Sequence, residues 1–146
     1  MDDSLISFAR EYCYLNYPNL IVPYNLITID IQINDIKLKA MIDTGCSKSV
    51  ISEEVIKKCK LEDHVDLLTV NNVNTGNGTT ETLGRIWILE FLINDYTVQI
   101  SPSILKGEHE FDIILGIDFL SSNKIDINFS KRELCLSENC KILFEV

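Results

Sequence analysis

Apolar and polar side chains alternate along residues 26–42, and this pattern predicts a β-hairpin. The odd-numbered isoleucines from Ile27 to Ile33 are separated by polar residues, as in a strand with one buried face. Asn34-Asp35 supplies a two-residue turn, after which the alternation resumes from Ile36 to Ile42. We therefore expect two antiparallel strands that deliver the chain to Asp43.

Most of the remaining chain also indicates short strands joined by turns. Residues 86–93 and 96–100 flank Asn94-Asp95 and predict a second hairpin. Residues 125–129 and 133–136 alternate around Ser130-Lys131, and residues 141–146 are compatible with a final strand. Residues 111–120 predict an apolar strand that breaks at Gly116 and continues into a short helix.

Three segments depart from the strand pattern. Ser52 can cap a short helix over residues 53–59, with two acids in its first turn, where the helix dipole favours them. Residues 70–82 are polar and rich in Gly and Asn, which predicts a long, mobile hairpin tip. The first twenty or so residues are less regular. We therefore divide the chain into an N-terminal extension, residues 1–22, that is irregular or removed, and one mostly β domain, residues 23–146.

Composition and charge narrow the class of protein. With 146 residues, of which 46% are hydrophobic, the chain can bury one core. No apolar run approaches the roughly 18–20 residues that cross a bilayer, and no N-terminal segment resembles a signal peptide. The net charge of −9 argues against a nucleic acid or an anionic membrane as partner. Five cysteines without a Cys-x-x-Cys motif argue against a metal site and for reduced thiols in the cytoplasm.

The motif with candidate chemistry is Asp43-Thr44-Gly45, which follows the second predicted strand and occurs once. A tight turn uses the same residue types for local hydrogen bonds and a positive φ, so the triplet alone is compatible with a plain turn. If the triplet is catalytic, a reaction that needs two carboxylates on one water requires a second chain. The sequence then predicts a homodimer.

The context of this triplet resembles a known family. The polar hairpin follows it, and then comes the run Ile114-Leu115-Gly116-Ile117-Asp118-Phe119-Leu120. This order resembles the retropepsin family of aspartic proteases, most closely the enzymes of plant pararetroviruses and Ty3-type LTR retrotransposons, over about residues 25–137. The resemblance implies a mostly β, retropepsin-like, closed barrel-like fold with a flap hairpin and one short helix, active as a homodimer.

The resemblance also implies a role for each matching residue. Asp43 is the catalytic carboxylate and faces Asp43 of the partner subunit, Thr44 locks the two turns together, and Gly45 lets substrate backbone approach. The remaining implied site residues are the flap tip, Asn74, Thr75, Gly76, Asn77 and Gly78, and the support beneath the turn, Ile114, Leu115 and Gly116.

The activity implied is that of an aspartic endopeptidase that processes a viral or retroelement polyprotein. Two carboxylates within about 3 Å share one proton, so the charged one can deprotonate a water while the other polarises the scissile carbonyl. This chemistry requires no metal and no cofactor. The substrates would be extended peptide segments, in the host cytosol or in a virus-like particle.

Two positions depart from the retroviral pattern. Retroviral members carry an acid two residues after the first Gly and an arginine directly after the later Gly, and these two side chains pair. This chain has Ser47 and Ile117 instead. Both partners are replaced together, which favours the transposon and pararetrovirus branch.

Other interpretations are hypotheses at this point. A retropepsin-fold domain can serve as a dimerisation or peptide-binding module with little proteolytic turnover. A phosphotransferase with Asp43 as nucleophile would need the motif Asp-Lys-Thr-Gly-Thr, which the chain lacks. Within the extension, Tyr17-Pro18 is either a self-processing junction or part of a plain linker that its prolines keep extended.

Overall fold

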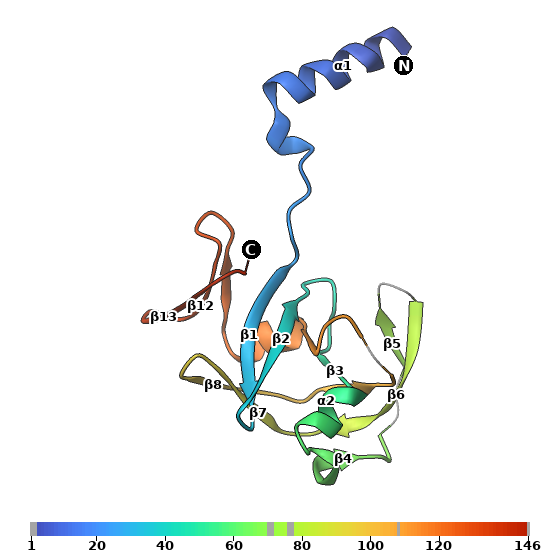
Figure 1. The fold of residues 1–146 in the computed structure, drawn as a ribbon, viewed down its shortest axis with the longest axis vertical. Helices are drawn as coiled ribbons and strands as arrows, with labels where there is room; N and C mark the ends of the chain where they lie inside the picture. Colours follow the sequence, from blue (N-terminus) through green and yellow to red (C-terminus); the bar gives the residue numbers. More distant parts are fainter. Residues whose placement is uncertain (1–2, 70–71, 76–77, 108, 146) are drawn as a thin grey trace.

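The computed structural model describes residues 3–69, 72–75, 78–107 and 109–145. The strands among these residues form a curved sheet of ten strands and a separate sheet of three strands (Figure 1). The large sheet has the order β4-β6-β9-β3-β10-β2-β1-β7-β8, and β5 pairs with β6 outside this path. The fold is mostly β, as the sequence predicted.

The bounds of the elements are as follows. The large sheet comprises β1 (Ile27–Ile33), β2 (Ile36–Ile42), β3 (Val50–Ser52), β4 (Val65–Asp66), β5 (Asn72–Thr75), β6 (Gly78–Ile86), β7 (Leu89–Ile93), β8 (Tyr96–Ile100), β9 (Ser103–Leu105) and β10 (Ile113–Leu115). The small sheet comprises β11 (Asp126–Asn128), β12 (Glu133–Ser137) and β13 (Cys140–Leu143). The helices are α1 (Asp3–Asn16), α2 (Glu53–Lys58) and α3 (Ile117–Ser122), with 3₁₀ turns η1 (Pro18–Leu20) and η2 (Glu62–His64).

The predicted hairpins are present with the predicted turns. β1 and β2 pair antiparallel, with Ile33 opposite Ile36. The two residues between them, Asn34 and Asp35, have φ of 47° and 65°, as a type I′ turn requires. Its geometry matches the twist of the flanking strands, so the turn fixes the register in which the isoleucines of β1 face the core.

Several boundaries differ from the sequence-based expectation. The predicted strand over residues 86–93 is two strands, because β6 ends at Ile86 and β7 begins at Leu89, with Trp87 and Ile88 exposed between them. The final strand is Cys140–Leu143 rather than residues 141–146. Strands β3 and β9 were not predicted, since three consecutive buried residues show no alternation.

Helices are more numerous than the one that the family resemblance implied. α2 begins as predicted: Ser52 Oγ accepts a hydrogen bond from Val55 N at 3.4 Å. α3 follows Gly116, also as the residue pattern predicted. The expectation of an irregular N-terminal segment is wrong, because residues 3–16 form α1. The domain boundary at residue 22 stays a prediction.

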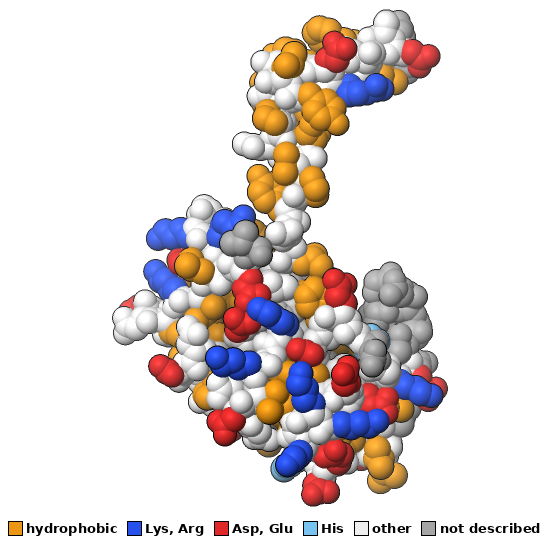
Figure 2. All heavy atoms as spheres, in the orientation of Figure 1, with side chains coloured by type: hydrophobic (Ala, Val, Ile, Leu, Met, Phe, Trp, Pro, Cys, Tyr) orange, Lys and Arg blue, Asp and Glu red, His pale blue; other side chains and the backbone are white. Residues whose placement is uncertain are grey.

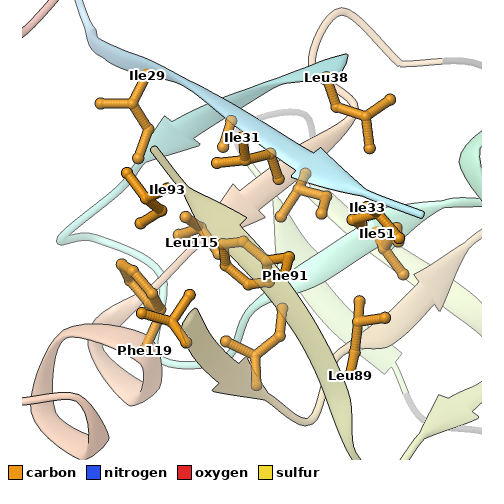
Figure 3. Packing of buried hydrophobic residues seen from close by; sticks show 14 of the residues in the cluster. Ile29, Ile31, Ile33, Leu38, Ile51, Leu89, Phe91, Ile93, Leu115 and Phe119 are labelled. Carbon is orange, nitrogen blue, oxygen red and sulfur yellow. The ribbon is translucent and has the colours of Figure 1, made fainter. Parts of the chain in front are cut away.

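The core lies inside the curved sheet, between its concave face and α3 (Figure 3). Alternate isoleucines of β1, namely Ile29, Ile31 and Ile33, point inward and are almost fully buried. Phe91 of β7 and Phe119 of α3 stack with ring centroids 6.0 Å apart. Burial of each such side chain contributes about 1.5–3 kcal/mol, so the core fixes the strands that carry the site.

Among the described residues, no helix combines the length and apolar character needed to cross a bilayer.

Candidate active site

Asp43 begins a tight turn at the end of β2. Ile42, the last residue of β2, pairs with Ile27 of β1 on one side and with Leu115 of β10 on the other. The next amide continues this pairing, since Asp43 N donates to Leu115 O at 2.9 Å. Cys46 N then donates to Asp43 O at 3.1 Å and closes the turn. Strands on both sides therefore determine where the Asp43 backbone lies.

The carboxylate of Asp43 is held by its own turn. Gly45 N donates to Asp43 Oδ1 at 2.9 Å. A Cβ on Gly45 would lie 3.1 Å from the same oxygen, a closer contact than most side chains make. Asp43 is half-buried, while Thr44 and Gly45 are exposed. The turn thus presents one positioned carboxylate at an open surface of the protein.

A second loop, at Gly116, supports the turn from below. Gly116 is buried, and a Cβ there would collide with the carbonyl oxygen of Cys46. Directly after it, Ile117 N donates to Cys46 O at 2.8 Å and Asp118 N donates to Ser47 O at 3.3 Å. The close contact of the two loops requires a residue without a side chain at position 116.

Ser49 and Asp118 join these two loops, although neither was predicted to belong to the site. Ser49 Oγ donates to Asp118 Oδ1 at 2.7 Å, and Ser49 N donates to Asp118 Oδ2 at 2.9 Å. Ser49 Oγ also accepts from Gly116 N at 3.0 Å, and Ser49 is fully buried. This pair links the same two loops that the acid and arginine link in retroviral members. The joint replacement at positions 47 and 117 was the available signal for it.

Cys46 lies within the turn and behaves as a small packed residue. Its Sγ donates to Lys48 O at 2.8 Å. Burial raises the pKa of the Cys46 thiol, and the negative charges of Asp43 and Asp118 raise it further, against the opposing effect of the hydrogen bond to Lys48. The thiol therefore stays protonated at neutral pH and is a poor nucleophile.

The predicted flap is a hairpin of β5 and β6. Thr75 pairs with Gly78, and the ladder continues to Asn72 opposite Glu81. Asn74 and Thr75 thus lie at the end of β5 and Gly78 begins β6, whereas Gly76 and Asn77 lie outside the described residues. In Figure 1 this hairpin and the loop between β2 and β3 project toward the same end of the molecule.

Beneath the flap, β6 pairs with β4 at very short range. Gly84 has φ of 155°, and a Cβ there would lie 2.6 Å from Asp66 O. The carboxylate of Asp66 accepts from Trp87 Nε1 at 2.9 Å and from Leu68 N at 2.9 Å. The guanidinium of Arg85 lies 4.5 Å from the centroid of the Trp87 ring. These contacts join both ends of the flap, and we call Asp66, Arg85 and Trp87 the flap base.

Asp43 supplies the carboxylate that lies at this turn. The neighbouring acid, Asp118, is already hydrogen-bonded to Ser49 and to Phe119 N. In the part of the chain that the structure describes, no three His, Cys, Asp or Glu side chains group as a metal site would need. Asp43, Thr44 and Gly45 thus form a turn that carries one carboxylate, and the loop of Leu115 and Gly116 lies against it. That this turn is half of a two-carboxylate site stays a prediction, as do the roles of the individual residues.

A known protein family and several known sequences match most of this chain. The family model described as aspartyl protease matches residues 18–128. The DNA damage-inducible protein 1 of Yarrowia lipolytica is 28% identical over 123 residues, which cover 84% of this chain and 30% of that protein. Protein DDI1 homolog 1 of Rattus norvegicus is 30% identical over 111 residues, which cover 76% of this chain and 27% of that protein. The chain thus spans about 30% of the length of these relatives.

A solved structure shares the fold. The crystal structure of the retroviral protease-like domain of Ddi1 from Leishmania major superposes with a TM-score of 0.74 at 22% identity. The match covers 85% of this chain and 97% of that chain. The ten-stranded sheet with its flap hairpin is therefore a retropepsin-like fold.

Proposed function

The chain belongs to the aspartyl protease family, and we propose from this that it is one half of a homodimeric aspartic endopeptidase. The observation that carries the proposal is the Asp43 turn, which presents a single positioned carboxylate at an open surface. A second copy related by a two-fold axis supplies the second carboxylate. Thr44 then hydrogen-bonds across the axis, and Gly45 leaves room for the substrate backbone.

The two carboxylates carry out hydrolysis without a covalent intermediate. Placed about 3 Å apart, they cannot both ionise, so they share one proton and titrate in two separate steps. The charged carboxylate removes a proton from a water as that water attacks the scissile carbonyl carbon. The protonated carboxylate donates a hydrogen bond to the carbonyl oxygen and stabilises the charge that develops there.

The flap binds the substrate as an extended strand. The β5–β6 hairpin offers backbone groups to a peptide that lies between it and the Asp43 turn. Closure of the flap excludes bulk water and aligns the scissile bond with the carboxylates. The substrate class is therefore an unfolded or extended segment of a polypeptide.

The kind of protein to which this domain belongs is a more specific question than its family, and the answer is part of this proposal. The relatives described above are the DNA damage-inducible protein 1 of Yarrowia lipolytica and the protein DDI1 homolog 1 of Rattus norvegicus, and they support a domain of the Ddi1 type. They give no support to the expected pararetroviral or Ty3-type origin. Processing of a viral or retroelement polyprotein, and a cytoplasmic site of action, stay proposals.

Replacement of Asp43 tests the mechanism. Asp43→Asn keeps the Oδ1 acceptor for Gly45 N but removes the base, so cleavage of a fluorogenic peptide library should fall to below a few per cent of the wild-type rate. Asp63→Asn, an exposed acid in η2, is the matched control and should retain full activity. Activity of Asp43→Asn above a few per cent would contradict an aspartic mechanism.

Pepstatin separates the peptidase from a passive peptide-binding module. The inhibitor mimics the tetrahedral intermediate, so a working site should bind it and Asp43→Asn should lose that binding. Binding of substrate peptides without pepstatin binding and without cleavage would favour the module instead.

A further inference from the structure

The N-terminal helix α1 has an apolar side that nothing in its own domain covers. Leu5, Phe8, Tyr12 and Leu15 recur at spacings of three and four residues and so lie on one side of the helix. None of the residues of α1 is buried, and Phe8 is 64% exposed. Figure 2 shows apolar side chains gathered along α1 and along the linker that joins it to the sheet.

This arm, residues 3–26, leaves the domain beside the Asp43 turn. The arm ends where β1 begins, and Ile27 is paired with Ile42, the residue directly before Asp43. The end of the chain lies at the same edge, because Glu145 N donates to Thr28 O at 3.0 Å. Figure 1 shows α1 standing clear of the sheet beyond this edge. The second copy that completes the site must approach the Asp43 turn, so the arm lies on the side that the second copy occupies.

The domain carries an apolar hollow at the root of the arm. Its volume is about 380 Å³, and its wall includes Tyr24, Ile27, Phe129 and Phe144. The rings of Phe129 and Phe144 meet edge to face with centroids 6.1 Å apart, yet Phe129 remains 69% exposed. A hollow of this size lies at the lower end of the range of about 300–1,000 Å³ that is typical of pockets for small ligands, so it has room for a large apolar side chain.

We propose that the two copies exchange arms, so that the apolar side of α1 from one copy packs into the hollow of the other. The proposal rests on the proposed homodimer and names a second contact surface for it, separate from the Asp43 turn. Both surfaces are apolar and exposed in one chain. The hollow and the root of the arm lie at the edge where the second copy must sit, and α1 extends beyond that edge.

Charge favours the same pairing. Arg132 lies in the wall of the hollow. Glu11 lies three residues after Phe8 and four before Leu15, so it borders the apolar side of α1. When α1 enters the hollow of the partner, Glu11 approaches the cation in its wall. Packing of α1 into the hollow of its own chain is geometrically unfavourable. Tyr24 of the linker already forms one wall of that hollow, and α1 points away from the sheet.

Two matched variants of α1 test the arm. Phe8 and Tyr14 are both 64% exposed, but Phe8 lies on the apolar side and Tyr14 on the opposite side. Serine has nearly the same helix propensity as either aromatic residue, so both variants keep the helix. Phe8→Ser should raise the dimer dissociation constant by at least about tenfold in analytical ultracentrifugation, whereas Tyr14→Ser should change it by less than about twofold. Equal constants for the two variants would overturn the proposal.

Mixing of two variants shows whether the arm reaches the other copy. Phe8→Ser has a damaged arm and an intact hollow, and Phe129→Ser has the reverse. Neither homodimer then contains an intact arm facing an intact hollow. In an exchanged heterodimer, the intact arm of the Phe129→Ser chain can pack into the intact hollow of the Phe8→Ser chain. Native mass spectrometry of an equimolar mixture should show heterodimer well above its statistical half. A statistical distribution would mean that the arm packs on its own chain or nowhere, and would overturn the exchange.

Failure of this proposal is distinct from failure of the proposed function. Above the dissociation constant, Phe8→Ser should cleave peptide at the wild-type rate per dimer, because Asp43 is unchanged. If the wild-type dimer is active and Phe8→Ser does not change its dissociation constant, the exchanged arm is contradicted but the proposed peptidase is not. A wild-type chain that stays monomeric at high micromolar concentration would remove the exchanged arm, while the Asp43→Asn and pepstatin tests would decide the peptidase.

Discussion

Asp43 could be predicted from the sequence, whereas the joint replacement at positions 47 and 117 indicated only that another pair joins the two loops, and did not identify Ser49 and Asp118. The triplet Asp43-Thr44-Gly45 is continuous, and its place after an alternating strand marks it as a turn at a strand end. The bond between Ser49 and Asp118 joins residues 69 positions apart, so no local pattern shows it. The position of each loop also depends on the parallel pairing of β2 with β10, which forms only in the folded sheet.

Removal of the Ser49 hydroxyl should weaken both the fold and the site. Ser49→Ala leaves the buried Gly116 N–H without this acceptor and removes a donor from Asp118, so unfolding free energy should fall by about 1–3 kcal/mol. Peptide cleavage should also slow, because the loop beneath Asp43 loses a fixed contact. Urea denaturation and steady-state kinetics measure the two effects. Ser47→Ala, an exposed neighbour in the same turn, is the control and should change stability by less than about 0.5 kcal/mol.

At the scale of elements, hairpins were predicted well because their signals are local. Alternation marks the strands and Asn-Asp marks the turns, with Asn34, Asp35 and Asn94 all at positive φ. Short strands such as β3 were missed because buried residues on both faces show no period. The helix α1 did carry a signal, the spacing of Leu5, Phe8 and Tyr12. The prolines after it suggested an extended segment, but proline constrains only its own φ and the residue before it.

The flap base should hold the flap throughout the mildly acid range. The hydrogen bond from Trp87, followed by that from Leu68 N, lowers the pKa of Asp66 below its ordinary value of 3.8. A lowered pKa means that these bonds are fully present above pH 3.8 and are lost only as the pH falls through the lower folded value. Trp87→Phe keeps an aromatic ring beneath Arg85 but removes the indole N–H. In an NMR titration, the pKa of Asp66 should then move back toward 3.8.

The same variant should change flap motion. Hydrogen exchange in β5 and β6 should be faster in Trp87→Phe than in the wild type, and a bound peptide inhibitor should slow it in both. Leu67→Ala, an exposed neighbour of Asp66, is the control and should leave exchange unchanged. Exchange that is indifferent to the inhibitor would remove the flap assignment.

At the scale of the whole molecule, the proposed function requires two chains for one complete site. Peptide cleavage per chain should therefore fall on dilution toward the dimer dissociation constant, since each separated chain retains one carboxylate. The rate should be highest below neutral pH, because a shared-proton pair works between its two apparent pKa values. Rate measurements from micromolar to nanomolar chain, and from about pH 3 to pH 9, test both. An optimum above about pH 8 would contradict a carboxylate pair.

Self-processing at Tyr17-Pro18 stays a prediction, and it requires that the local structure around this bond first open. The peptide bond lies in a folded turn, because Tyr17 N donates to Cys13 O at 2.8 Å and Leu20 N donates to Tyr17 O at 3.0 Å. A cleft that binds extended strands must first open this turn. Incubation at mildly acid pH should release a new N-terminus at Pro18 slowly in the wild type and never in Asp43→Asn. An intact chain by mass spectrometry in an active preparation would contradict self-processing at this bond.

A half-site encoded once has a genetic consequence. In the proposed dimer, both subunits contribute the same residues to the cleft. A single codon change therefore alters two opposite positions of each active site. Where a normal and an Asp43→Asn allele are expressed equally and pair at random, only about a quarter of dimers carry both carboxylates. Such an allele should behave as a dominant inhibitor rather than a simple loss of one copy, and its severity should decrease when expression of the normal allele is raised.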